Sequence, residues 1–171
     1  MEQVHFVDTT IRDGHQSLWA ERMSTGMMLP IAKNLNEAGF EAIELLSGSH
    51  IKKAVRELRE DPWERIKRIC ALCPDTPMRL IAGRVNTFAF DPPCMYELFI
   101  GRMAANGIRQ ARISEPWNDL PGWTYRAKVA RQFPAFQASF RPICPRASAQ
   151  PRSSSMRACA SWFPALSRWP S

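Results

Sequence analysis

Hydrophobic positions follow one repeating order along residues 1–132, in which a short apolar run is followed by a longer amphipathic stretch. The short runs predict four buried strands, at Val4–Val7, Ala42–Leu46, Met78–Ala82 and Ile108–Ile113. The amphipathic stretches predict five helices. The first runs from a Ser24 or Thr25 cap to about Ala38, the second covers His50–Leu58, and the third begins after an Asp61 cap. The fourth begins at Pro92 or Pro93 and ends before Gly107, and the fifth covers Gly122–Gln132. Such an alternation is typical of a parallel sheet covered by helices.

Two α/β architectures fit this alternation, and the pattern alone does not separate them. One is a partial TIM (β/α)8 barrel, made of about the first four β/α units, because a complete barrel needs about 250 residues and the chain has 171. The other is an open, doubly wound sheet. The first loop has neither G-x-G-x-x-G nor G-x-x-x-x-G-K-[ST], so the usual nucleotide-binding loop is missing from it.

Residues 133–171 differ in composition from the rest of the chain. They contain six Pro, eight Ser and five Arg, with no Lys, Asp or Glu and no helical or strand period. We therefore predict two regions: residues 1–132 form the barrel-like part, and residues 133–171 form an irregular or disordered tail. A sharper hypothesis is that the tail is translated out of frame after about Gln132, which reading the other two frames of the gene would test.

The charge distribution argues against nucleic acid as a partner. The net charge is +7, but residues 1–132 hold 18 basic and 16 acidic residues, so most of the excess lies in the tail. This nearly balanced region shows no basic stripe. The chain has no apolar run of the roughly 20 residues that a membrane span needs. Its first residues lack a basic patch leading into an apolar stretch, so we expect a cytoplasmic protein.

The five cysteines do not suggest a disulfide framework or a zinc site. Their number is odd, and the pair Cys70-x-x-Cys73 lies inside a helical pattern with no second pair at suitable spacing. We expect buried or half-buried thiols.

The densest polar cluster, Asp8–Ser17, directly follows the first predicted strand. In parallel β/α folds, functional sites are built at the carboxyl ends of the strands. Two carboxylates, a guanidinium, an amide and an imidazole within this loop could bind a hard cation together with an anionic substrate. The alternative is a solvated polar loop with a helix cap.

Two motifs resemble those of a known enzyme family. DTTIRDGHQSL, at residues 8–18, resembles the signature of the pyruvate carboxyltransferase domain family, which includes pyruvate carboxylase, the oxaloacetate decarboxylase α subunit and transcarboxylase. The wider superfamily, with hydroxymethylglutaryl-CoA lyase and isopropylmalate synthase, shares D-x-T-x-R-D-x-x-Q. EDPWER, at residues 60–65, resembles the segment that sets the biotin-dependent carboxyltransferases apart from the lyase and synthase branches. The resemblance covers about residues 3–132.

The resemblance implies a truncated biotin-dependent carboxyltransferase or decarboxylase, which acts on pyruvate or oxaloacetate through a metal-stabilised enolate. It also implies a divalent metal (Zn, Mn or Co), carboxybiotin on a separate carrier domain or subunit, and homo-oligomers among full-length members. The chain has no A-M-K-M biotin-attachment motif. The alternatives are an acyl-CoA lyase or synthase of the same superfamily, or a non-catalytic remnant.

The resemblance also assigns roles to individual residues. Asp13 matches the family's metal-ligand aspartate, Arg12 the arginine that stabilises the enolate oxygen, and Gln16 a glutamine that contacts substrate. Arg12 and Gln16 are therefore the candidate catalytic and substrate-binding residues. The family's L-R-G-A-N, whose arginine grips the substrate carboxylate, reads A-G-R-V-N at residues 82–86, so Arg84 is a substrate-binding candidate displaced by one position.

Three acidic residues have other expected roles. Asp8 is expected to hydrogen-bond the backbone of its own loop, and Glu44 is a candidate to point into the site from the second strand. Glu60 is expected on a solvated helical face, where it would alternate with Lys52, Lys53, Arg56 and Arg59.

The family's metal site also uses a carbamylated lysine and a His-x-His, both on later strands. The chain has three histidines, His5, His15 and His50, and no His-x-His. Since catalytic metal sites use several protein ligands, we expect the chain alone to be inactive, and the sequence leaves open whether it is itself an enzyme.

Overall fold

A parallel sheet of five strands forms the centre of the protein. The computed structural model describes residues 4–83, 92–114, 119–133 and 136–140. The strands lie side by side in sequence order, and all neighbours are parallel: β1 (Val7–Asp8), β2 (Ala42–Ser47), β3 (Met78–Ile81), β4 (Gln110–Ile113) and β5 (Gln137–Phe140). A doubly wound sheet reverses its strand order at a switch point. The continuous order of this sheet therefore favours the barrel alternative.

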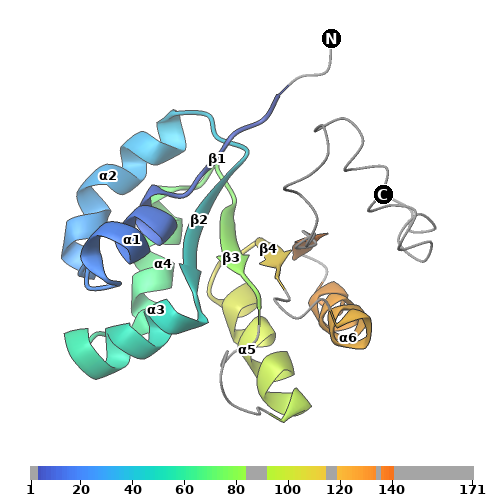
Figure 1. Cartoon of the computed structure of the whole chain (residues 1–171). Helices are drawn as coiled ribbons and strands as arrows, with labels where there is room; N and C mark the ends of the chain where they lie inside the picture. Colours follow the sequence, from blue (N-terminus) through green and yellow to red (C-terminus); the bar gives the residue numbers. More distant parts are fainter. Residues whose placement is uncertain (1–3, 84–91, 115–118, 134–135, 141–171) are drawn as a thin grey trace, which may run out of the picture.

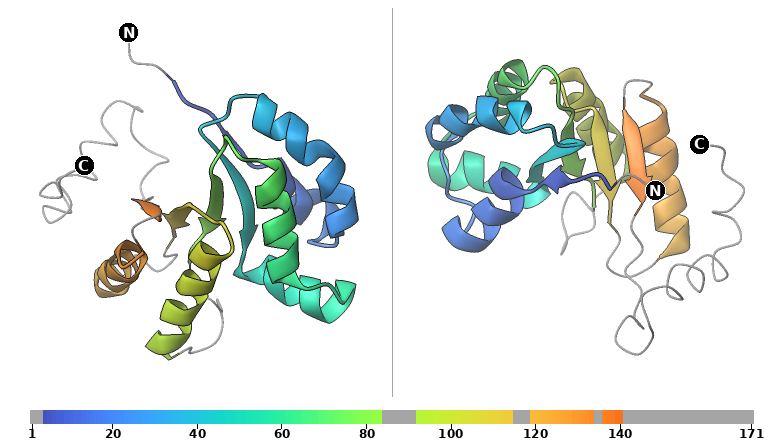
Figure 2. Two further views of the ribbon diagram at one scale, coloured as in Figure 1. Left: turned by 180° about the vertical axis from the view of Figure 1, so that it is seen from behind. Right: turned by 90° about the horizontal axis from the view of Figure 1, so that it is seen from above.

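Helices follow the strands as the sequence pattern predicted. The four longer helices are α2 (Thr25–Glu37), α4 (Pro62–Leu72), α5 (Pro93–Ala105) and α6 (Leu120–Arg131), and they lie along one side of the sheet (Figures 1 and 2). Shorter helical segments follow β1 and β2: the π-helical turn η1 (Thr10–Gly14), α1 (His15–Trp19), α3 (Gly48–Lys53) and the π-helical segment η2 (Ala54–Leu58). At the start of α4 the Asp61 carboxylate accepts the N–H of Trp63 at 2.8 Å, which confirms Asp61 as a cap.

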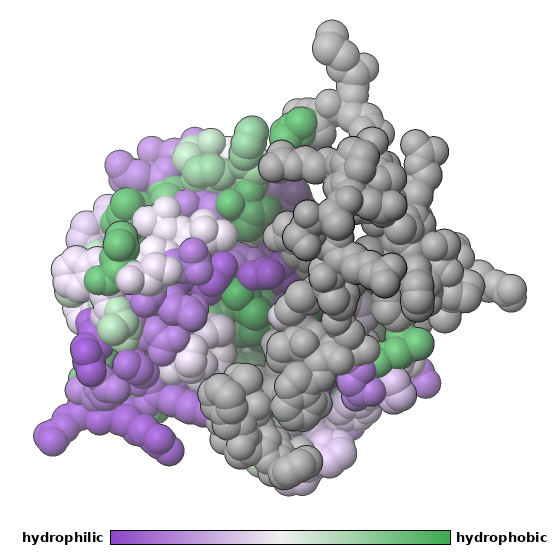
Figure 3. Space-filling view, in the orientation of Figure 1, coloured by the Kyte–Doolittle hydropathy of each residue, from purple (hydrophilic) through white to green (hydrophobic). Residues whose placement is uncertain are grey.

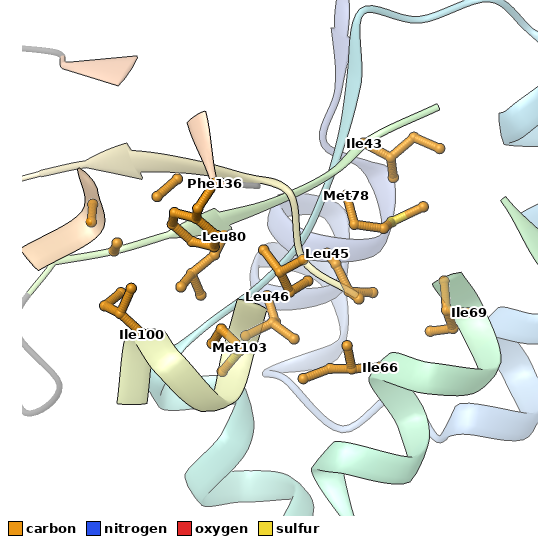
Figure 4. Close-up of a cluster of buried hydrophobic side chains, with 14 of the residues drawn as sticks. Ile43, Leu45, Leu46, Ile66, Ile69, Met78, Leu80, Ile100, Met103 and Phe136 are labelled. Atoms are coloured by element: carbon orange, nitrogen blue, oxygen red, sulfur yellow. The ribbon is translucent and has the colours of Figure 1, made fainter. Parts of the chain in front are cut away.

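The hydrophobic core lies where these helices pack on the sheet (Figure 4). Residues 42–46 of β2 are buried on both faces of the strand, which explains their continuous apolar pattern. Ile66 and Ile69 of α4, and Ile100 and Met103 of α5, are fully buried against the sheet. Each such side chain contributes about 2 kcal/mol of hydrophobic stabilisation.

The first strand is shorter than predicted. The predicted strand Val4–Val7 is wrong at its start, because only Val7 and Asp8 pair with β2. Val4 and Phe6 are exposed, although Glu41 N–H still donates to the Phe6 carbonyl at 2.8 Å. An apolar run therefore overstated the length of a strand at the edge of the sheet.

The fifth strand lies where we expected irregular structure. Gln137–Phe140 pairs with β4 in parallel, and the preceding Phe136 is buried in the core. The sequence F-Q-A-S-F at residues 136–140 alternates apolar and polar positions, which is the strand period. The unusual composition of the whole tail obscured this short alternation. Residues 141–171 lie outside the described residues.

Two cysteines are packed against the helices, as expected. Cys73 is buried and its Sγ lies 3.2 Å from the Ala32 carbonyl, and Cys70 is half-buried against Gly107. Burial raises the pKa of the Cys70 thiol to about 11 and raises the pKa of Cys73 as well. Cys94, in contrast, is exposed.

We expect Cys94 to react with a maleimide at pH 8 about tenfold or more faster than Cys70, because the thiolate is the nucleophile and burial disfavours it. Brief labelling followed by peptide mass mapping measures both rates in one sample. A Cys94→Ser variant that still labels at the wild-type rate within the described residues would contradict the expectation.

The surface around α3 and η2 is hydrophilic. Figure 3 shows hydrophilic side chains gathered at its lower left, where Figure 1 places α3. Arg56 and Arg59 are exposed there, as predicted for a solvated face, whereas Lys52 and Lys53 are half-buried. In the part of the chain that the structure describes, the helices are too short or too polar to span a bilayer.

Candidate functional site

The loop after β1 is folded into a compact turn at the carboxyl end of the strand. The Thr9 carbonyl accepts the N–H groups of Arg12, Asp13 and Gly14 at 3.2, 2.6 and 3.2 Å, which forms η1. The Asp8 carboxylate accepts the backbone N–H and the hydroxyl of Thr10 at 3.1 and 2.7 Å. The expected role of Asp8, to hydrogen-bond the loop backbone, is confirmed.

Arg12 extends from this turn onto the buried carboxylate of Glu44. Its Nε and Nη2 donate to Glu44 Oε2 at 3.0 and 2.8 Å, and its Nη1 donates to Asp13 Oδ1 at 2.7 Å. The Glu44 side chain is 3% exposed and that of Arg12 is 11% exposed. Charge-assisted hydrogen bonds of this kind are strong and fix the guanidinium plane. Glu44 therefore does point into the candidate site.

A second arginine binds the same carboxylate from β4. Arg112 Nε donates to Glu44 Oε1 at 2.7 Å, and its Nη2 lies 3.3 Å from Glu44 Oε2. Sequence reasoning missed Arg112. The signal was the alternation of β4, in which Ala111 and Ile113 are buried and Arg112 faces the opposite side. Two guanidinium groups and one buried carboxylate thus meet at the carboxyl edge of the sheet.

The structure describes two of the other three predicted site residues, Asp13 and Gln16. Asp13 lies beside Arg12, with its side chain 55% exposed. Gln16 is exposed on α1, three residues farther along the same segment. Arg84 lies outside the described residues, so its predicted contact with a substrate stays a prediction.

The described residues do not by themselves fit a catalytic divalent cation. No group of three or more His, Cys, Asp or Glu side chains among residues 4–83, 92–114, 119–133 and 136–140 could hold a metal ion. The Asp13 carboxylate, the predicted ligand, is paired with Arg12, and Glu44 is bound by two arginines. A catalytic ion needs several protein ligands, and Asp13 alone would provide one.

The loop histidine is part of the packing, not a ligand. His15 is fully buried, and its Nε2 accepts the N–H of Met23 at 2.7 Å, which requires a neutral ring. Burial, followed by the charges of His50 and Arg65, lowers the pKa of His15 to about 4. The ring lies edge-on to His50 with centroids 4.9 Å apart.

Glu60 and Arg65 of the EDPWER motif form a polar clamp, in which Glu60 accepts hydrogen bonds from Arg65 and from Thr25 of α2. The expectation that Glu60 lies on a solvated helical face was therefore wrong. Glu60 Oε2 accepts the Thr25 hydroxyl at 2.5 Å and Arg65 Nη2 at 2.6 Å, and Thr25 N–H also donates to this carboxylate. Arg65 is 4% exposed and its Nη2 lies 3.3 Å from the Met23 carbonyl. Burial alone would raise the pKa of Glu60, but these hydrogen bonds outweigh it and lower the pKa.

Comparison with known proteins reveals clear relatives of the chain. No protein-family model matches it. It is 36% identical over 131 residues to a pyruvate carboxylase subunit from Methanocaldococcus jannaschii, which covers 75% of this chain and 23% of that protein. It is 28% identical over 119 residues to the methylmalonyl-CoA carboxyltransferase 5S subunit of Propionibacterium freudenreichii subsp. shermanii, covering 68% of this chain and 24% of that protein.

A solved structure agrees with these relatives. The carboxyl transferase domain of Rhizobium etli pyruvate carboxylase, determined with pyruvate and biocytin, superposes with a TM-score of 0.73 at 27% identity over 80% of this chain and 24% of that chain. The chain thus spans about a quarter of the length of each of these three proteins. The five-stranded sheet and its helices match part of the TIM barrel of that carboxyl transferase domain, and the chain is homologous to the pyruvate carboxylase and carboxyltransferase subunits named above.

Proposed function

We propose that this homologue of the pyruvate carboxyltransferase domains provides the enolate-stabilising part of a biotin-dependent carboxyl-transfer site. Its substrate would be pyruvate or oxaloacetate. The observation that carries the proposal is the placement of Arg12, held on the buried Glu44 beside Arg112, at the carboxyl edge of the sheet. Active sites of (β/α)8 barrels lie at this edge.

The geometry of Arg12 supports a role at a developing negative charge. A guanidinium has five N–H groups, and in Arg12 the Nε, one Nη1 and one Nη2 hydrogen are donated to Glu44 and Asp13. The two that remain can donate to the keto oxygen of pyruvate as the methyl group loses a proton and that oxygen becomes an enolate oxygen. Because the guanidinium is already fixed, little reorganisation accompanies the reaction. The exposed Gln16 amide would bind the substrate from the same segment.

The metal ion and carboxybiotin that the family uses would be held mainly by groups other than the described residues. A divalent ion would supply Lewis acidity, and carboxybiotin on a separate carrier domain or subunit would supply or accept the carboxyl group. Asp13 is the one described residue that we assign to the metal. Since one carboxylate cannot hold a catalytic ion well, we also propose that the chain alone does not turn over oxaloacetate.

Two alternative functions, an acyl-CoA lyase or synthase and a non-catalytic remnant, can be distinguished from this proposal. The relatives are named carboxylase and carboxyltransferase, which favours carboxyl transfer over an acyl-CoA lyase or synthase. A non-catalytic remnant predicts that the segment contributes nothing to a complete site.

A segment graft tests the proposal directly. Residues 4–132 would replace the matching segment of the Methanocaldococcus jannaschii protein, and oxaloacetate decarboxylation by the purified graft would be measured. We expect a working graft whose kcat falls about tenfold or more on Arg12→Lys, because lysine keeps the charge but loses the planar fork. Arg56→Lys, which alters an exposed arginine on η2, is the matched control and should leave kcat unchanged.

A folded graft without activity, or one in which the Arg12 and Arg56 variants behave alike, would overturn the proposal. Folding of each graft is checked by circular dichroism and by its elution volume, so that loss of the site is distinguished from loss of the fold.

A further inference from the structure

The Arg12 side chain is held by a residue from outside its own loop. Within η1, the Thr9 carbonyl fixes the backbone but leaves the guanidinium without a partner other than the exposed Asp13. Glu44, which is 2% exposed on β2, binds both Nε and Nη2. A buried carboxylate whose lone pairs accept from two arginines has little freedom to turn. The direction of the Arg12 guanidinium is therefore set by β2.

The Arg12 backbone is held by a second residue of the same region. His50 Nε2 lies 3.0 Å from the Arg12 carbonyl, while His50 Nδ1 lies 3.3 Å from Ser47 N and 2.8 Å from Ser47 Oγ. The Ser47 N–H can only donate, so Nδ1 accepts and the hydrogen-bond network assigns the proton to Nε2. His50 thus donates to Arg12 and accepts from Ser47, the residue that caps α3. The ring is 2% exposed and packs against His15.

Both contacts come from one short segment, the corner where β2 passes into α3. Glu44 lies on the strand and His50 lies in the first turn of the helix, six residues farther on. Arg112 of β4 also binds Glu44, so the carboxylate is fixed from across the sheet as well. Together these contacts hold Arg12 at its carbonyl and at its guanidinium.

We infer that Glu44 and His50 are positioning residues for Arg12, and that Arg112 acts with them by fixing the Glu44 carboxylate. The inference rests on the proposed function insofar as Arg12 meets the substrate. The positioning itself can be measured without any reaction. Glu44→Gln retains the shape of the side chain but places an NH₂ group against one of the two guanidinium groups, so at least one arginine loses its partner.

The test uses the full 171-residue chain labelled with ¹⁵N, and it measures hydrogen exchange at the Arg12 Nε–H by nuclear magnetic resonance. We expect exchange to be about tenfold or more faster in Glu44→Gln and in His50→Phe, because each removes a hydrogen bond that holds the group away from water. His50→Gln, whose amide can still donate to the Arg12 carbonyl, should restore slow exchange. Glu57→Gln is the matched control, because it removes a carboxylate from a different arginine, Arg22.

Backbone amide exchange in β3, recorded on the same samples, shows whether a variant has merely loosened the fold. Faster exchange at the Arg12 Nε–H with unchanged exchange in β3 supports the inference. If Glu44→Gln fails to fold, the histidine variants provide the test: fast exchange in His50→Phe and slow exchange in His50→Gln support the inference. Unchanged Arg12 exchange in both Glu44→Gln and His50→Phe would overturn it. An inactive wild-type graft together with a positive exchange result would reject the proposed function and leave the positioning inference standing.

Discussion

Replacing Glu60 by alanine is expected to lower the free energy of unfolding by about 3 kcal/mol. Glu60 joins the start of α2 to α4, because it accepts from Thr25 and from Arg65. Without it the Arg65 guanidinium, which is 4% exposed, retains the Thr25 hydroxyl and the Met23 carbonyl as neutral partners, and no other carboxylate among the described residues forms an ion pair with it. An uncompensated buried charge costs far more than a lost surface ion pair. Urea unfolding at pH 7, followed by circular dichroism, measures the loss.

Glu57→Ala provides the matched control, because Glu57 pairs with Arg22 at the surface and the loss of an exposed ion pair should destabilise the chain far less than the loss of Glu60. The double variant Glu60→Ala with Arg65→Met separates charge from packing. If the buried charge is the cause, the double variant should be more stable than Glu60→Ala alone. Equal losses in the Glu57 and Glu60 variants would show that the clamp contributes no more than a surface pair.

The strand–helix alternation was readable from the sequence because burial repeats over a few neighbouring residues. Four of the strands and the helices between them follow that local signal, although β1 is shorter than its apolar run. The order of the strands in the sheet could not be predicted from the sequence. Whether the strands continue in one direction or reverse depends on contacts between units, and only the order β1 to β5 decides it.

The candidate site divides in the same way. Arg12 and Asp13 stand in one continuous motif, so the sequence located them, and the structure places them side by side. Arg112 lies 68 residues from Glu44 along the chain, and their contact depends on the register of three strands. No local pattern contains that information.

Glu60 shows how a local pattern can mislead. Extending the helical period that begins at Lys52 predicted that Glu60 lies on a solvated face. The backbone of Arg59, however, adopts a left-handed conformation with φ of 53°, so η2 ends at Leu58, two residues before Glu60. The helical period therefore does not reach Glu60, and its side chain turns inward to Thr25 and Arg65.

Acidification from pH 7 to pH 5 is expected to lower the free energy of unfolding by about 2 kcal/mol through His15. The pKa of His15 is about 4 in the folded chain against an ordinary 6.5, mainly because the ring is buried. The unfolded chain therefore binds more protons in this range. The stabilising contribution is complete above pH 6.5 and is lost as the pH falls through 6.5 toward 4. Burial lowers the pKa of the neighbouring His50 too, which adds to the loss in the same direction.

Urea unfolding at half-unit steps between pH 7 and pH 5 measures this loss. His15→Gln should remove the His15 part of this dependence, because the glutamine oxygen can still accept the Met23 N–H without titrating in this range. His5→Gln, which changes an exposed histidine, should leave the slope unchanged. The hydrogen bonds that lower the pKa of Glu60 place its own contribution below pH 4.5, outside the measured range. A slope that is undiminished in His15→Gln would therefore contradict the prediction and mean that the proton is taken up elsewhere, with His50 as the first group to examine by the same substitution.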